Sequence, residues 1–193
     1  MRRKYQQMYF RDGKELLLLT YLFKPIEISG QLYSLAGFVK STLLPGDIAL
    51  VIDNSQSKET EYEYACAIMD NLGKVRVLIE PEVYWDIIRG KAYARTTLLH
   101  ELGHIYNNDL REIGGKGSTY DLERLKSIQS GIVHEREIKA DAFAVQFLGI
   151  SAVCEGLSVL RQNHINEGDE ADSPSVSELT RRIELLIAAS HPS

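Results

Sequence analysis

The sequence predicts an α+β fold in which a small N-terminal β-sheet packs against a mainly helical C-terminal part. The prediction rests on a contrast between the two parts of the chain. Short apolar runs with strand-like composition lie before residue 81, whereas from Lys91 onward apolar residues recur at helical spacing. The chain has 193 residues, enough for one hydrophobic core, and contains no internal repeat, so a single domain is expected.

Five segments of the N-terminal part are expected to form strands and helices in alternation. The apolar run Glu15–Phe23 suits a strand, although its leucines also fit a helix. Mixed spacing favours a helix over Ile26–Lys40, and the β-branched run Ile48–Ile52 is typical of a buried strand. Helical spacing of apolar residues predicts a helix over Lys58–Asn71. Alternation of apolar and charged residues predicts a strand over Lys74–Glu80, at the edge of the sheet and with one exposed face.

The C-terminal part is expected to be almost entirely helical. Two polar connectors, residues 107–119 and 163–175, are rich in glycine and other turn-forming residues and are interpreted as loops within one domain. The expected helices are Ala92–Tyr106, Asp121–Ser130, Ile132–Leu148, Ser151–His164 and Val176–Ala189.

Composition gives no indication of nucleic-acid binding or of a membrane anchor. The formal net charge is −5, and both signs are interspersed without a basic face. Cys66 and Cys154 lie far apart in the sequence, which indicates two reduced thiols rather than a disulfide or a thiolate metal site. The apolar run Leu16–Phe23 is too short to span a bilayer, so we expect a cytoplasmic protein.

A His-Glu-x-x-His motif lies within the first of the expected C-terminal helices. His100 and His104 are four residues apart, so their imidazoles share one helical face and can bind one metal ion. Glu101 is displaced around the helix, which leaves its carboxylate free to act as a general base. An apolar stripe over the preceding residues 92–99 indicates that this helix is buried. The motif therefore predicts a Zn²⁺ site.

A catalytic zinc ion takes three protein ligands and keeps a fourth position open. Glu137 is the best candidate for the third ligand, because it lies on a second amphipathic helix that can cross the first. Asp141 follows one turn later on the same face and can accept the remaining ring N–H of a ligand histidine, expected to be His100. Asp121, beside a loose glycine-serine-threonine signature, and His134, one turn before Glu137, remain alternatives.

Two motifs together resemble those of the ImmA/IrrE-type gluzincin metallopeptidases: the His-Glu-x-x-His motif and the run Glu137-x-x-Ala140-Asp141-Ala142-Phe143-Ala144. The resemblance covers roughly residues 74–148. It implies one zincin-like domain over residues 1–193, and a regulator that cleaves a partner repressor. The chain departs from the family in having Gly149 where a proline is usual, and in showing no helix-turn-helix segment.

The expected activity is zinc-dependent hydrolysis of a peptide bond in a protein or peptide substrate, with a transcriptional regulator as a candidate substrate. Glu101 would take a proton from water and pass it to the leaving amine. The rival hypothesis is a non-catalytic or latent zincin-like module that binds a partner protein; the intact Glu101 argues against it. Candidates for stabilising the oxyanion are Tyr106, Tyr120, His134 and His164.

Overall fold

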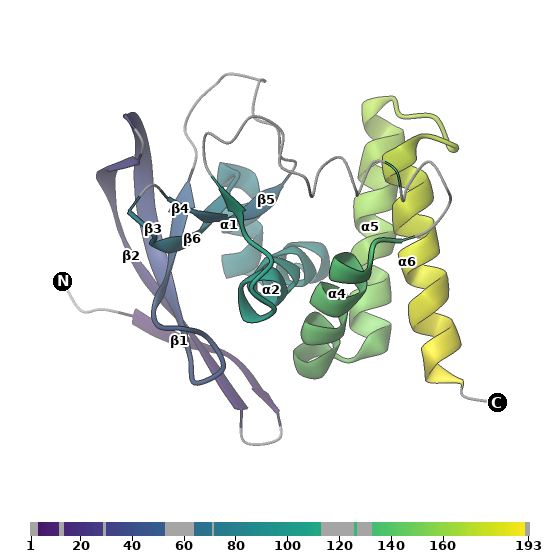
Figure 1. Ribbon diagram of the computed structural model, residues 1–193, viewed down its shortest axis with the longest axis horizontal. Coiled ribbons are helices and arrows are strands. Elements are labelled where there is room, and N and C mark those ends of the chain that lie inside the picture. Colours follow the sequence, from purple (N-terminus) through teal and green to yellow (C-terminus); the bar gives the residue numbers. More distant parts are fainter. Residues whose placement is uncertain are drawn as a thin grey trace.

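The computed structural model describes residues 4–11, 14–28, 30–52, 64–70, 72–112, 126 and 133–191. Within these ranges the N-terminal residues form a β-sheet at one side of the molecule and the C-terminal residues form helices at the other (Figure 1). Helix α2 (Ala92–Tyr106) lies between the two parts and contacts both the sheet and the helices that follow. The predicted α+β class, with an N-terminal sheet and a mainly helical C-terminal part, is confirmed.

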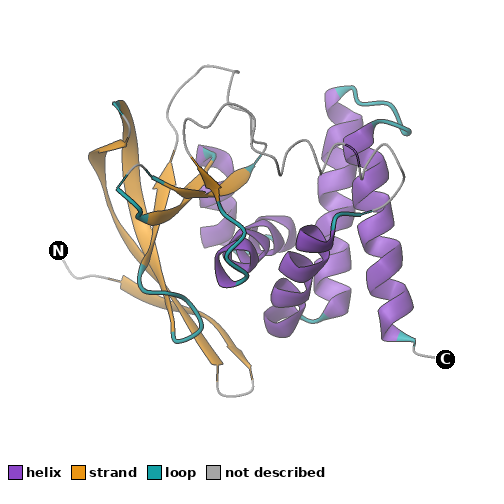
Figure 2. Ribbon diagram, viewed as in Figure 1, coloured by secondary structure: helices purple, strands orange, loops and turns teal. Residues whose placement is uncertain are grey.

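The described part of the sheet has seven strands in the order β1-β2-β3-β4-β6-β5-β7 (Figure 2). Successive strands from β1 to β4 pair antiparallel, β6 is parallel to β4, β5 is antiparallel to β6, and β7 is parallel to β5. The bounds are β1 Lys4–Arg11, β2 Lys14–Ile28, β3 Gln31–Ser41, β4 Ile48–Ile52, β5 Ala65–Met69, β6 Val75–Ile79 and β7 Arg111–Glu112.

Both faces of the central strands are apolar and buried. In β4 the side chains of Ile48, Leu50 and Ile52 belong to the main core, which includes residues of the helices. Those of Ala49 and Val51 belong to a second cluster, made of strand residues only. Such a strand reads as a continuous apolar run because neither side faces water.

Within the described ranges, four further helices accompany α2: α1 (Pro81–Arg89), α4 (Glu135–Leu148), α5 (Ile150–Glu167) and α6 (Pro174–Ser190). Helix α1 begins at a proline, which tolerates the first helical position, and ends at Gly90 in the left-handed conformation. Helices α5 and α6 lie side by side at the C-terminal end of the molecule (Figure 1). None of the helices in the described ranges has both the length and the apolarity to cross a membrane.

Several sequence predictions agree with these bounds. The strand Ile48–Ile52 and the helix Ala92–Tyr106 are found with the predicted ends. The run Glu15–Phe23 is a strand, within the longer β2. The last three predicted helices correspond to α4, α5 and α6 within a few residues at each end. The predicted helix Asp121–Ser130 lies outside the described residues except for Lys126.

The helix predicted over Ile26–Lys40 is wrong, because this segment forms the end of β2 and most of β3. The two strands turn at Gly30, whose φ of +82° favours glycine. Farther along, Leu35 pairs with β4 and so does Gly37, but the register shifts between them. This irregularity breaks the period-2 alternation, and the resulting mixed spacing resembles a helix.

Two other predictions for the N-terminal part are also wrong. Within the predicted helix Lys58–Asn71, the described residues include strand β5, whose consecutive apolar side chains are buried in both clusters of the sheet. The strand predicted over Lys74–Glu80 is confirmed as β6, but it lies between β4 and β5 and not at the sheet edge, so both of its edges are already hydrogen-bonded. Strand β1 and helix α1 were not predicted, and neither was the short strand β7, which lies within the predicted loop 107–119.

Helices α2 and α4 pack closely against each other at Gly103. A methyl group placed on Gly103 would lie 2.7 Å from both the Cα and the carbonyl oxygen of Ala140 on α4. Backbone atoms cannot move aside as the end of a side chain can, so only glycine fits here at this helix separation. Gly103, between the two motif histidines, therefore sets how near α4 can come to them.

We expect Gly103→Ala to destabilise the protein by about 1–3 kcal/mol, since the added methyl group must push the two helices apart. Helix propensity alone predicts the opposite sign, a gain of about 1 kcal/mol. Urea denaturation of the original chain and of Gly103→Ala measures the change in the free energy of unfolding and so distinguishes the two predictions. A variant as stable as the original chain would show that α2 and α4 do not pack at this distance.

Candidate metal centre

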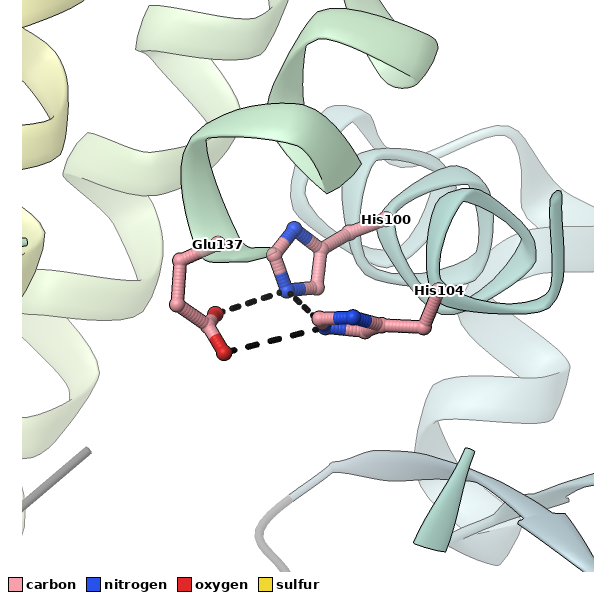
Figure 3. Close-up of side chains that lie close together, drawn as sticks. All are labelled: His100, His104 and Glu137. Atoms are coloured by element: carbon pink, nitrogen blue, oxygen red, sulfur yellow. Dashed lines mark hydrogen bonds and ion pairs between the residues drawn. The ribbon is translucent and has the colours of Figure 1, made fainter. Parts of the chain in front are cut away.

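Three potential ligand side chains converge where α2 faces the start of α4 (Figure 3). His100 and His104 project from one face of α2, with their Nε2 atoms 3.1 Å apart. Glu137 reaches them from the first turn of α4: its Oε2 lies 3.0 Å from Nε2 of His100, and its Oε1 lies 3.7 Å from Nε2 of His104. The three residues are buried, and their ligand atoms lie within 4.8 Å of one another, close enough to hold a metal ion.

The local structure at the start of α4 favours a carboxylate at this point. His134 caps the helix, because its Nδ1 accepts a hydrogen bond from the backbone N–H of Arg136 at 3.2 Å. Glu137 follows in the first turn, where the free N–H groups and the helix dipole stabilise negative charge. His134 is thus a capping residue at the edge of the centre, and the group of three ligand residues does not include it.

Asp141 lies one turn beyond Glu137 on α4 and contacts the ring nitrogen of His100 that faces away from the other two ligand residues. Its Oδ1 is 2.8 Å from Nδ1 of His100, the contact expected from the sequence. Because Nδ1–H of His100 donates this hydrogen bond, Nε2 is the ring atom that faces Glu137 and His104. This is the arrangement in which an acidic residue fixes the tautomer and ring orientation of a metal-binding histidine.

Arg182 of α6 also belongs to the centre, although it was not predicted from the sequence. Its Nε donates to Oδ2 of Asp141 at 2.7 Å and its Nη2 donates to Oδ1 at 2.5 Å. One signal was available: Arg182 falls on the apolar face of its helix, three residues after Leu179 and four before Leu186. A charged residue at such a position needs a buried partner.

The buried charges shift one another's pKa values in opposite directions. Burial and the Arg182 charge lower the pKa of His100, but the hydrogen bonds with Asp141 and Glu137 outweigh them and raise it to about 9. Burial, followed by the charge on His100, lowers the pKa of His104 to about 3. Burial raises the pKa of Glu137, yet its hydrogen bond with His100 and the surrounding positive charges hold it well below its usual range. Without metal, the histidine pair therefore carries one positive charge at neutral pH.

Glu101, the predicted general base, lies next to His100 on α2 but outside the group of ligand residues. Its Oε2 accepts a hydrogen bond from the backbone N–H of Ala67, in β5, at 2.7 Å. The carboxylate is therefore held between the ligand-bearing helix and the sheet. This position leaves the three other side chains to bind the metal.

Of the remaining candidates, Tyr106 and His164 lie within the described residues, and neither belongs to the group of ligand residues. The exposed ring of Tyr106 packs on Phe143, at 5.2 Å between centroids. His164 is buried against Asp169 and Tyr64, and Tyr64 in turn meets Tyr93, almost two turns before His100 on α2. Tyr120 and Asp121 lie outside the described residues.

Comparison of the chain with protein-family models, curated proteins and solved structures finds no match. The resemblance to the ImmA/IrrE-type metallopeptidases stays a prediction from the two motifs. What the structure adds is independent of any family: residues 37 positions apart in the sequence, His100 and Glu137, place their ligand atoms 3.0 Å apart.

We expect His100 to titrate with a pKa of about 9 in the metal-free protein, well above the value of about 6.5 for an unfolded histidine. Because the folded-state pKa is the higher one, the charged His100 stabilises the fold below pH ~6.5, and this contribution is lost as the pH rises through about 9. Nuclear magnetic resonance titration of the imidazole C–H signals in chelator-treated protein measures the pKa.

The matched variants for this titration are Asp141→Asn and Asp169→Asn. Asp141→Asn removes the carboxylate that contacts His100 and should lower the pKa of His100. Asp169→Asn removes the carboxylate that contacts His164 and should leave the pKa of His100 unchanged. A pKa of His100 at or below the unfolded value in the original chain would contradict the described charge arrangement.

Proposed function

We propose that this protein is a zinc-dependent metallopeptidase in which His100, His104 and Glu137 bind the metal. The separations between the Nε2 atoms of the two histidines, and between each Nε2 and a carboxylate oxygen of Glu137, carry the proposal. Two ligands of a tetrahedral zinc ion, each at about 2.0–2.1 Å from the metal, lie about 3.3 Å apart. The observed separations of 3.1, 3.0 and 3.7 Å bracket that value. Two imidazoles with one carboxylate are also a common ligand set of catalytic zinc.

A bound zinc ion would lower the pKa of water to about 7 and polarise the carbonyl of a peptide bond. Glu101 supplies the proton transfers: it takes a proton from the attacking water and gives it to the leaving amine. The hydrogen bond from Ala67 supports this role, because it holds the carboxylate through one oxygen without consuming its charge. Asp141 keeps His100 presented to the metal through Nε2.

The substrate class we propose is a peptide bond in a protein or peptide. The more specific proposal, that the substrate is one regulatory protein, rests on the resemblance of the two motifs to the ImmA/IrrE-type metallopeptidases. A transcriptional regulator is the first candidate. The alternative is a latent or non-catalytic module in which the same centre serves recognition of a partner protein. Glu101 separates the two hypotheses, because metal binding alone does not require a base beside the ligands.

We expect Glu101→Gln to reduce peptide hydrolysis by about 10²–10⁴-fold while zinc binding stays near that of the original chain. Glutamine can still accept the hydrogen bond from Ala67 but cannot take up a proton. The assay incubates zinc-loaded protein with a peptide library of mixed sequence and identifies new termini by mass spectrometry. Glu155→Gln, on an exposed position of α5, is the matched control and should cleave at the original rate.

Two outcomes would contradict the proposal in different ways. Undiminished cleavage by the Glu101→Gln variant would remove Glu101 as the base. A zinc-loaded original chain that cleaves no peptide, and no candidate regulator, would favour the interaction module.

A further inference from the structure

We propose that Arg182 is a positioning residue of the metal centre: it fixes Asp141 and, through Asp141, the imidazole of His100. The C-terminal helix α6 then contributes a residue to the metal centre, although neither of the two sequence motifs lies on it. This inference rests on the metal-binding half of the proposed function and does not depend on hydrolysis.

Arg182 and Asp141 form a bidentate ion pair. Nε of the guanidinium meets Oδ2 at 2.7 Å, and Nη2 meets Oδ1 at 2.5 Å, so both carboxylate oxygens are engaged. Paired bonds of this kind fix the plane of the carboxylate as well as its position. Oδ1 is the oxygen that also contacts Nδ1 of His100 at 2.8 Å. The orientation of the imidazole is thus set by a carboxylate that is itself held in place.

The guanidinium also lies against two of the three ligand residues. Nη2 is 3.0 Å from Nδ1 of His100, and Nη1 is 3.6 Å from Oε2 of Glu137. The side chains of Glu137 and Asp141 are only 4% and 2% exposed. Two buried carboxylates one helical turn apart repel each other, and a charge with no partner is costly in such surroundings. Arg182 provides a positive charge between them.

Stability alone is a poor explanation for an arginine at this position. The neighbours on its helical face, Leu179 and Leu186, indicate that an apolar residue would suit the packing. Replacing buried ion pairs by apolar residues is often neutral or stabilising. Only one of the two ligand histidines has such a supporting contact in the part of the chain that the structure describes: Nδ1 of His100 contacts Asp141, whereas Nδ1 of His104 has no hydrogen-bond partner there. Ordering of the ligand set therefore depends on the connection from Arg182 through Asp141 to His100.

The test is the zinc dissociation constant of matched variants, measured by competition with a chromophoric chelator. We expect Arg182→Gln to weaken zinc binding by about 10- to 100-fold, the usual effect of removing a residue that orients a ligand. Arg182→Lys keeps the positive charge but lacks the planar guanidinium, so its zinc affinity should lie between those of Arg182→Gln and the original chain. Arg181→Gln is the control: Arg181 precedes Arg182 on α6 but pairs with Glu184 at the surface, and its loss should leave zinc affinity unchanged.

A second comparison separates positioning from a merely structural role. Arg182 acts on His100 through Asp141, so in an Asp141→Asn background Arg182→Gln should cause little further loss of zinc affinity. That double variant has no unpaired charge left from the Arg182–Asp141 pair, which protects the experiment against misfolding of the single variant. The absorption spectrum of cobalt(II) bound in place of zinc reports the ligand geometry, and we expect it to change in Arg182→Gln and not in Arg181→Gln.

Two results would overturn the inference: zinc affinity and cobalt spectrum of Arg182→Gln equal to those of the original chain, or an undiminished loss in the Asp141→Asn background. Either would leave the proposed hydrolysis intact. A protein that binds zinc with the expected variant pattern but cleaves no peptide would reject the proposed function and support the inference. Failure of the original chain to bind zinc would overturn both.

Discussion

The close approach of α2 and α4 at Gly103 is the constraint on which the rest of the site depends. A side chain as small as alanine would meet the backbone of Ala140 at 2.7 Å, so this separation exists only because position 103 carries hydrogen alone. The contact point lies between the two histidines along α2, and one turn beyond Glu137 along α4. Helices held this close can share a metal ion through short side chains; helices a few ångströms farther apart could not.

This close approach brings four buried ionisable side chains together, and the surrounding elements balance their charges. The four are His100, His104, Glu137 and Asp141. Glu137 and Asp141 enter from α4, and Arg182 reaches them from α6. The sheet holds Glu101, the residue after His100 on α2, through a backbone N–H of β5. The sheet and the helices are therefore both needed around α2. Each supports a different side chain of the same short motif.

The sequence predicted the local part of this arrangement well and its long-range part incompletely. A four-residue spacing places His100 and His104 on one face of any helix, and the run from Glu137 to Asp141 follows the same rule. Arg182 was missed because its role depends on how α6 packs, which helical spacing does not determine. In the N-terminal part, a register shift in β3 and burial of β5 on both faces removed the alternation by which strands are recognised. The α+β class survived these errors because the C-terminal helices have clear periodicity.

The metal content of the tag-free protein, measured by elemental analysis, tests the central claim most directly. The described geometry predicts about one zinc per chain, retained on dialysis, with the metal lost in His104→Ala and in Glu137→Ala. An original chain that holds no zinc, even after zinc is added back, would contradict the account. Zinc retained in Glu137→Ala at the original affinity would place the third ligand elsewhere, with Asp121 and His134 the next residues to replace.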